Sequence, residues 1–194
     1  MGGSYRASSD SRIKNDHYPT PWSLVHQLLD VEEFEGYILE PCSGEHKSIA
    51  KYLRSAGRNV VDYDLFYGRE DERYDFLTEP GHFESIITNP PYRLSIEFIE
   101  TAYRVSDKFA FLLPLDYLHG KLRYDRLWLN GLRPKRIYTF VRRPLFDGTL
   151  RNDGKYNTGS TTFSWFVYSG KFWGLPEMDI IDNSKYIIRK RDRE

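Results

Sequence analysis

The residues Asn89-Pro90-Pro91-Tyr92 follow the apolar run Ile86-Ile87 and combine an amide, a stiff turn and an aromatic ring. The two prolines fix φ and remove two backbone donors, so carbonyl oxygens of the turn are free to accept hydrogen bonds. Together with the Asn89 side-chain oxygen, such a carbonyl could hold both hydrogens of an –NH2 group. An isolated tetrapeptide of this kind can also be a rigid turn without chemistry.

An aromatic amino group needs this help before it can act as a nucleophile. Its lone pair is conjugated into the ring, so the nitrogen must move toward tetrahedral geometry before it attacks an electrophile. Two acceptors that tighten as the nitrogen becomes positive stabilise the transition state more than the ground state. Stacking of an extruded base on Tyr92 would contribute about 1 to 3 kcal/mol, comparable with the cost of extrusion.

Strand and helix patterns alternate along the chain and position this turn. The expected strands cover residues 37–40, 59–63, 85–88, 109–113, 136–141 and 163–168. The expected helices run from Trp22 to about Glu33, through Ile49, Ala50 and Leu53 with a stop at Gly57, and from Ile96 to Val105. These patterns predict an α/β fold with a mostly parallel central sheet, a C-terminal antiparallel strand and helices on both faces. Ligands bind beyond the carboxyl ends of strands in such sheets, which is where Asn89 falls.

The length of 194 residues fits one domain of ordinary size. We expect a flexible N-terminal tail over residues 1–15, a single domain over 16–182 and a charged C-terminal tail over 183–194. Hydrophobic residues make up 40% of the chain, and no apolar run approaches the roughly 18 residues that a membrane span needs. The polar start also lacks the apolar centre of a signal peptide.

Charge and cysteine content restrict the partners and the compartment. The net charge is zero, but residues 23–100 hold 16 acidic against 7 basic residues, whereas residues 121–155 hold 10 basic against 3 acidic. The basic stretch could face phosphates or simply form a solvated face. The single cysteine, Cys42, excludes an intrachain disulfide and gives no metal-ligand spacing. We therefore expect a protein of a reducing cytoplasm with no metal and no membrane partner.

The order of motifs resembles that of the amino-group methyltransferases of nucleic acids. The similarity is greater to the small bacteriophage-type adenine-specific DNA methyltransferases, and it covers residues 16–169. It implies the Rossmann-like class I methyltransferase fold, S-adenosylmethionine as the cofactor and DNA as the partner. It also implies a role such as restriction-modification in the cytoplasm of a bacterial host cell, for a monomer or homodimer.

The resemblance also implies a cofactor site. The segment from Ile38 to Glu45 looks like the first cofactor motif, with Glu40, Pro41 and Gly44 at its characteristic positions. The family usually has a second glycine two residues after the first, where this chain has His46. The resemblance carries the ribose-binding acid onto Asp64, with Asp62 as the less favoured candidate, although both could merely end a strand in a turn.

Two shorter motifs complete the implied cofactor site. Asp75 and Phe76 resemble the motif that accepts from the cofactor's adenine amino group and lines its pocket. Thr20 and Pro21 match the amino-terminal motif near the methionine part of the cofactor. These two residues also predict a helix start, with Thr20 as the cap and Pro21 as the first helical residue. His119 has no partner motif and is interpreted as structural.

Segment 142–161 is the candidate DNA-contact loop, because members of the family contact DNA there. Its candidates for phosphate or base contacts are Arg142, Arg143, Arg151 and Lys155, with a solvated loop as the alternative for each. Larger relatives have a separate recognition domain. A compact recognition element implies a short target or loose specificity.

The expected activity is methyl transfer to the N6 amino group of adenine in DNA after base flipping. An RNA or protein-glutamine methyltransferase is the main alternative, since the Asn-Pro-Pro-Tyr turn suits any planar –NH2 group. The cytosine amino group has the same geometry. A protein that has lost catalysis and only binds DNA or a partner is the third possibility, motivated by His46.

Overall fold

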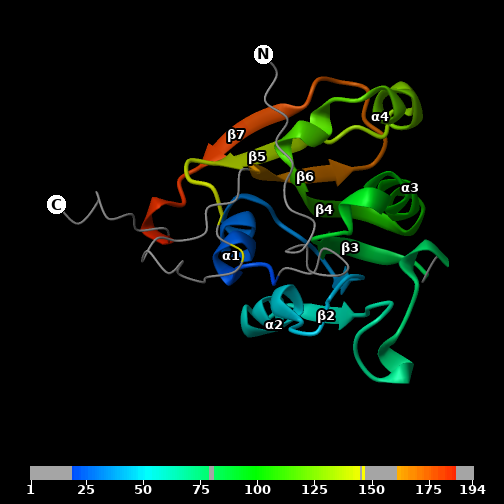
Figure 1. Cartoon of the computed structure of the whole chain (residues 1–194), viewed down its shortest axis with the longest axis vertical. Helices are drawn as coiled ribbons and strands as arrows, with labels where there is room; N and C mark the ends of the chain where they lie inside the picture. The colour runs from blue at the N-terminus through cyan, green and yellow to red at the C-terminus, as the bar shows by residue number, and fades with distance from the viewer. Residues whose placement is uncertain (1–18, 79–80, 145, 147–160, 187–194) are drawn as a thin grey trace, which may run out of the picture.

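The computed structural model describes residues 19–78, 81–144, 146 and 161–186, which contain a seven-stranded sheet (Figure 1). The strands stand in the order β2-β1-β3-β4-β6-β5-β7. Their bounds are β1 Tyr37–Glu40, β2 Asn59–Asp62, β3 Phe83–Thr88, β4 Ser106–Pro114, β5 Arg136–Phe140, β6 Phe163–Ser169 and β7 Glu177–Ile181.

Strand β6 runs against the other strands of the described sheet. It pairs antiparallel with β4 and β5, while the remaining neighbouring pairs are parallel. The predicted mostly parallel sheet with a C-terminal antiparallel strand is therefore confirmed. The carboxyl ends of the parallel strands and the start of β6 share one edge of the sheet. Strand β7, which pairs parallel with β5 at the outside, was not predicted.

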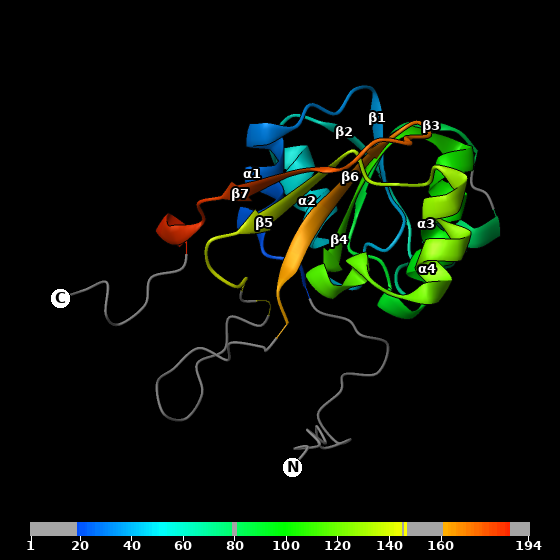
Figure 2. The same cartoon turned by 90° about the horizontal axis from the view of Figure 1, so that it is seen from above.

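Helices cover both faces of the sheet, as expected (Figure 2). One face carries α1 (Trp22–Val31) and α2 (Ser48–Ser55), and the other carries α3 (Ser95–Val105) and α4 (Lys121–Arg126). The predicted cap of α1 is wrong, because the residue before the helix is Pro21 and it makes no side-chain cap bond. Short 3-10 helices lie at η1 Glu70–Glu72, η2 Phe76–Thr78, η3 Tyr92–Leu94, η4 Leu115–Leu118, η5 Trp128–Asn130 and η6 Ser184–Tyr186. None of the helices in the described ranges is long and apolar enough to cross a membrane.

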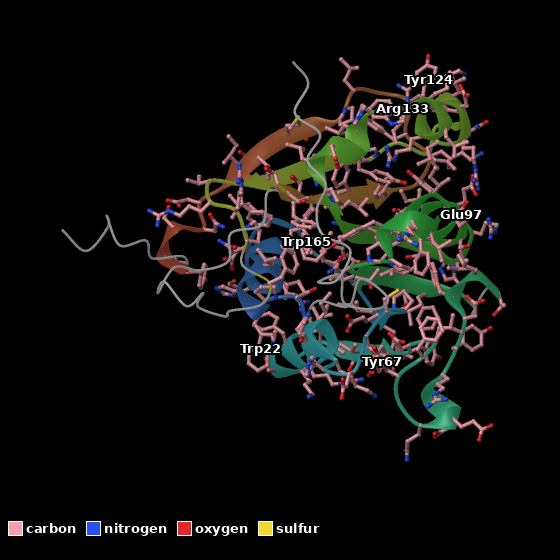
Figure 3. All side chains as sticks on the ribbon, viewed as in Figure 1. Trp22, Tyr67, Glu97, Tyr124, Arg133 and Trp165 are labelled. Carbon is pink, nitrogen blue, oxygen red and sulfur yellow. The ribbon has the colours of Figure 1, made fainter. Side chains whose placement is uncertain are left out.

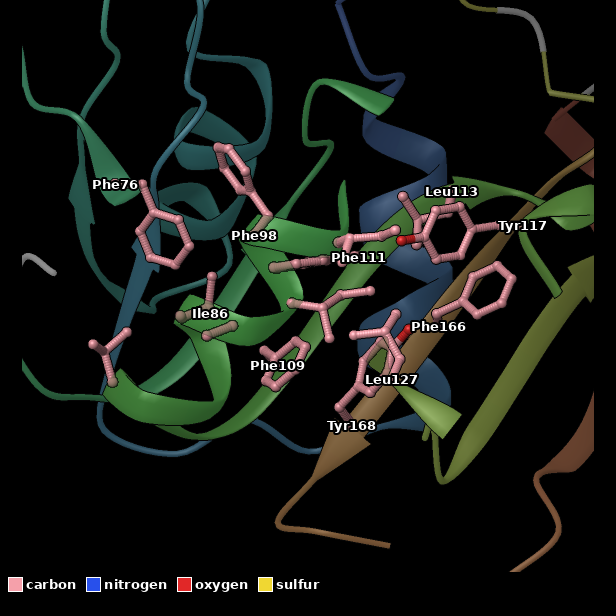
Figure 4. Packing of buried hydrophobic residues seen from close by; sticks show 14 of the residues in the cluster. Phe76, Ile86, Phe98, Phe109, Phe111, Leu113, Tyr117, Leu127, Phe166 and Tyr168 are labelled. Atoms are coloured by element: carbon pink, nitrogen blue, oxygen red, sulfur yellow. The ribbon is translucent and has the colours of Figure 1, made fainter. Parts of the chain in front are cut away.

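The alternation of side chains along β4 divides the core into two layers. Phe109, Phe111 and Leu113 point toward the α3 side, whereas Ala110 and Leu112 point toward α1 and α2. This is the period of two that a strand covered on both faces requires. On the α3 side, the rings of Phe109 and Tyr168 stack with centroids 4.5 Å apart (Figure 4).

Polar contacts at two places fix α1 against the sheet. The fully buried Trp165, on β6, lies next to α1 (Figure 3), and its indole N–H donates to the Leu24 carbonyl at 3.0 Å. Just after the helix, the buried Glu32 accepts from Lys108 at 2.5 Å, from Arg136 at 2.9 Å and from the Tyr138 hydroxyl at 2.8 Å. Burial alone would raise the pKa of Glu32, but these three partners outweigh it and hold the pKa below its ordinary value.

We expect Glu32→Ala to lower the free energy of unfolding by about 3 kcal/mol, at the low end for a broken buried pair. The Tyr138 hydroxyl would be left unpaired, whereas Lys108 and Arg136 are partly exposed and can reach water. Because the folded-state pKa is lowered, the contribution of Glu32 is present above about pH 4.5 and is lost as the pH falls through the folded pKa. Urea unfolding at several pH values measures both effects. The exposed Glu33→Ala is the control, and equal stability of the two variants would contradict the expectation.

Candidate functional site

A cavity of about 590 Å³ opens at the carboxyl edge of the sheet. Its size falls within the range of small-molecule sites. It is built by the segments that follow three neighbouring strands, together with the residues before α1 and around η2. Among the catalytic and cofactor-binding residues proposed from the sequence, those that line the cavity are Thr20, Glu40, Pro41, Asp64, Asp75, Phe76, Asn89, Pro90 and Pro91. Pro21, Gly44 and Tyr92 were also proposed but do not line it.

Asn89 follows β3 directly, and its amide is held at both ends. Its Nδ2 donates to Thr20 Oγ1 at 3.2 Å, and its Oδ1 accepts from the Tyr92 hydroxyl at 2.9 Å. The carbonyl of Pro91 accepts from Leu94 N–H at 2.9 Å in the turn that opens η3. Within the described residues, the carbonyl of Pro90 accepts no backbone hydrogen bond outside the helices and strands, so it can serve as an acceptor.

Tyr92 lies beside the cavity. Its half-buried ring packs at 5.7 Å from the ring of Phe163, the first residue of β6. Phe163 in turn contacts Phe146, with ring centroids 4.7 Å apart. The strand reversal that brings β6 next to β4 thus places a second aromatic ring next to the Asn89 turn, which the sequence did not reveal.

Glu40, the last residue of β1, is 1% exposed, and its Oε2 accepts from the backbone N–H of Ala50 at 2.6 Å. This bond ties the strand end to the first turn of α2. Burial, together with the carboxylates Asp62 and Asp64, raises the pKa of Glu40 to about 8. The carboxyl group therefore keeps its proton at neutral pH.

Asp62 and Asp64 have different environments although only Tyr63 separates them. Asp64 lines the cavity, where Oδ1 accepts from the N–H groups of Phe66 at 2.8 Å and Tyr67 at 3.1 Å. Its Oδ2 accepts from Gly44 N–H at 2.8 Å. A carboxylate oxygen has about two lone-pair sites, so Oδ2 has one more to offer a ligand.

Asp62 is held away from the cavity by two cations. Its carboxylate pairs with Lys47 at 3.1 Å and with Arg54 of α2. Burial opposes ionisation of Asp62, but the two neighbouring cations Arg54 and Lys47 prevail and lower its pKa. The ion pairs give Asp62 a structural role and leave Asp64 as the acid that faces the cavity.

Asp75 and Phe76 form another part of the lining. Asp75 Oδ1 accepts from Leu77 N–H at 3.0 Å, and its Oδ2 has no donor in the part of the chain that the structure describes. Phe76 is buried, and its ring lies 5.0 Å from that of Phe98 on α3. An open acceptor therefore lies next to an apolar wall.

Several lining residues were not predicted as site residues. They are Pro19, Cys42, Ser43, His46, Ser48, Ile49, Leu65, Phe66, Tyr67, Tyr74, Leu77, Arg93, Leu94 and Phe98. Many of them directly follow the end of a predicted strand, and this position is the sequence signal that could have identified them.

Burial raises the pKa of the Cys42 thiol well above its usual value, so this cysteine is a poor nucleophile. Within the described ranges, no group of three or more His, Cys, Asp or Glu could hold a metal ion.

The candidate DNA-contact residues have different environments. Arg142 lies just after β5, and its backbone N–H and carbonyl bond to the Asn183 side chain at 2.8 and 2.7 Å. Arg143 is exposed at the same edge as the cavity. Arg151 and Lys155 lie outside the described residues.

Comparison with solved structures identifies the fold as the Rossmann-like fold of class I methyltransferases. The methyltransferase subunit of a type I restriction-modification system from Streptococcus thermophilus matches with a TM-score of 0.57 and 14% identity, over 90% of this chain and 49% of that one. A putative RNA methyltransferase from Pyrococcus horikoshii matches with a TM-score of 0.55 and 11% identity, over 80% and 87% of the two chains.

A putative class I S-adenosylmethionine-dependent methyltransferase from Listeria monocytogenes gives a TM-score of 0.51 at 12% identity, over 82% of this chain and 62% of that one. The chain thus spans about half the length of the Streptococcus subunit. No protein-family model matches the chain, and no curated protein matches its sequence. These likenesses establish the fold alone.

Glu40→Gln tests the protonation state of the buried carboxyl. The folded protein keeps the Glu40 proton up to about pH 8, whereas a glutamate in the unfolded chain releases its proton at about pH 4.3. The free energy of unfolding therefore falls as the pH rises between these values, by up to about 1.4 kcal/mol per pH unit, and Glu40→Gln removes this slope. Urea unfolding from about pH 5 to 8 measures it. The control Glu35→Gln, at an exposed position, should keep the pH dependence of the free energy of unfolding. If Glu40→Gln kept it as well, another group would be responsible for the slope.

Proposed function

We propose that the chain transfers a methyl group from S-adenosylmethionine to the N6 amino group of adenine in DNA. The observation that carries the proposal is the cavity itself. It brings Asn89 and the carbonyl of Pro90 together with two nucleoside-compatible acids, Asp64 and Asp75. A rigid turn without chemistry would need no such cavity.

The lining fits the adenosyl part of the proposed cofactor. The remaining lone pair of Asp64 Oδ2 suits a ribose hydroxyl, and the open Oδ2 of Asp75 suits an adenine amino group. Phe76 and Phe98 supply an apolar wall for the base. S-adenosylmethionine, when bound, supplies a methyl group already activated on a sulfonium, so no metal is needed for the transfer.

Asn89 and Pro90 act on the amine that receives the methyl group. One hydrogen of the –NH2 group donates to Asn89 Oδ1 and the other to the Pro90 carbonyl. As the N–C bond formed and the S–C bond of the sulfonium broke, the nitrogen would take on positive charge and both hydrogen bonds would strengthen, which would lower the barrier. The neutral thioether would be the leaving group, and the methylated nitrogen would release one proton to solvent. The Tyr92 and Phe163 rings beside the turn provide the aromatic surface for an extruded base.

DNA is the proposed substrate because the cation Arg143 and the start of segment 142–161 lie at the same edge as the cavity. The structural likeness to the methyltransferase subunit of a restriction-modification system also favours DNA. RNA is the second candidate, favoured by the likeness to a putative RNA methyltransferase, and the turn would also accept a glutamine amide. Mass analysis of nucleosides and peptides after incubation with DNA, RNA or protein separates these substrates.

A chain that has lost catalysis is expected to fail at the first step, the binding of S-adenosylmethionine. His46 motivates this alternative, because it lies in the cavity lining where the resembled family usually has glycine. Calorimetry with S-adenosylmethionine tests it. Failure to bind the cofactor would refute the proposed enzyme and favour a binding role.

Asn89→Ala removes one of the two acceptors and is expected to lower kcat by about 10²- to 10³-fold, the usual loss for one preorganised transition-state contact. Transfer of labelled methyl groups to duplex DNA measures the rate. Binding of S-adenosylmethionine should persist, because the Asp64 and Asp75 contacts remain. Asn59→Ala, at the exposed start of β2, is the matched control. An Asn89→Ala enzyme with the wild-type rate would eliminate the assigned role.

A further inference from the structure

Thr20 makes a long-range contact that none of its expected roles explains. Its side chain is 5% exposed, and its Oγ1 accepts from Asn89 Nδ2 at 3.2 Å across 69 positions of sequence. The hydroxyl does not cap α1, whose cap residue is Pro21. The buried hydroxyl is therefore directed at the proposed reaction centre.

This bond restricts the rotation of the Asn89 amide. The terminal torsion of asparagine has a broad energy profile, so an amide without partners turns freely. Here Thr20 holds the amino end and the Tyr92 hydroxyl holds the oxygen end, at 3.2 and 2.9 Å. With both ends engaged, the plane of the amide is defined before any substrate arrives.

The arrangement leaves acceptor capacity for a substrate. An amide oxygen has two lone pairs, of which the Tyr92 hydroxyl uses one. The amino group of Asn89 would offer a hydrogen to the substrate, which is the wrong polarity for an incoming –NH2 group. By binding this amino group, Thr20 leaves the amide oxygen as the group available to the incoming amine.

We infer that Thr20 is a positioning residue, which binds the amino end of Asn89 and so presents its Oδ1 to the amine that is methylated. This inference rests on the proposed function for its catalytic consequence. The hydrogen bond itself can be tested without any activity. The resemblance assigned Thr20 to the cofactor's methionine part, so cofactor affinity distinguishes the two roles.

The first experiment follows the Asn89 side-chain –NH2 signals by NMR in the full chain. We expect one of the two hydrogens to exchange with water about tenfold more slowly than in an exposed asparagine such as Asn59, the factor that corresponds to a hydrogen bond of about 1.4 kcal/mol. Thr20→Val, which keeps the shape and removes the acceptor, should abolish this protection. Thr20→Ser, which keeps the hydroxyl, should restore it. Protection that survives in Thr20→Val overturns the inference.

The second experiment separates positioning from cofactor binding. Thr20→Val should lower kcat about tenfold, with KM for DNA and the affinity for S-adenosylmethionine changed less than about twofold, and Thr20→Ser should recover the rate. A loss of cofactor affinity at unchanged kcat would assign Thr20 to the cofactor instead. Absence of methyl transfer by the wild-type chain would refute the proposed function, while the NMR experiment would still decide whether Thr20 holds Asn89.

Discussion

The site depends on the common direction of β1, β2 and β3. Parallel neighbours end at the same edge, so the residues that follow Glu40, Asp62 and Thr88 lie together although the chain separates them widely. The hydrogen bond from Gly44 to Asp64 joins the first two of these ends, and the bond from Asn89 to Thr20 joins the third to the segment before α1. These two bonds connect four of the segments that line the cavity.

The strand ends bring the carboxyl groups of three acids close together, and each carboxyl group is accommodated in a different way. Glu40 keeps its proton, since burial raises its pKa to about 8. Asp62 is neutralised by Lys47 and Arg54. Asp64 is compensated by three backbone N–H groups. Asp64 thereby lines the cavity while its carboxylate is held by backbone donors, and within the described residues it makes no ion pair.

The sequence was most informative where hydrophobic pattern and turn chemistry agree. The apolar run before Asn89 and the runs around β1, β4 and β6 predicted the strands and the antiparallel pair that the structure contains. Strand β7 escaped prediction because both of its faces are largely exposed, so Glu177–Ile181 shows no buried stripe. Helix α4 buries none of its six residues and likewise lacks an apolar face. The contacts of Thr20 and Phe163 depend on tertiary pairing, which local pattern does not encode. The assignments of the site residues stay predictions.

The reversal at β6 also determines where this architecture can change. The connection from β5 to β6 leaves and returns at the edge of the sheet where the cavity opens, and its two ends are anchored in the framework. Arg142 bonds to Asn183 at one end, and Thr162 accepts from Leu115 N–H at 2.7 Å at the other. Sequence can therefore be exchanged or lengthened between these anchors without altering the register of any strand. In evolution or in the laboratory, this connection can diverge while the sheet that supports the cavity is inherited unchanged.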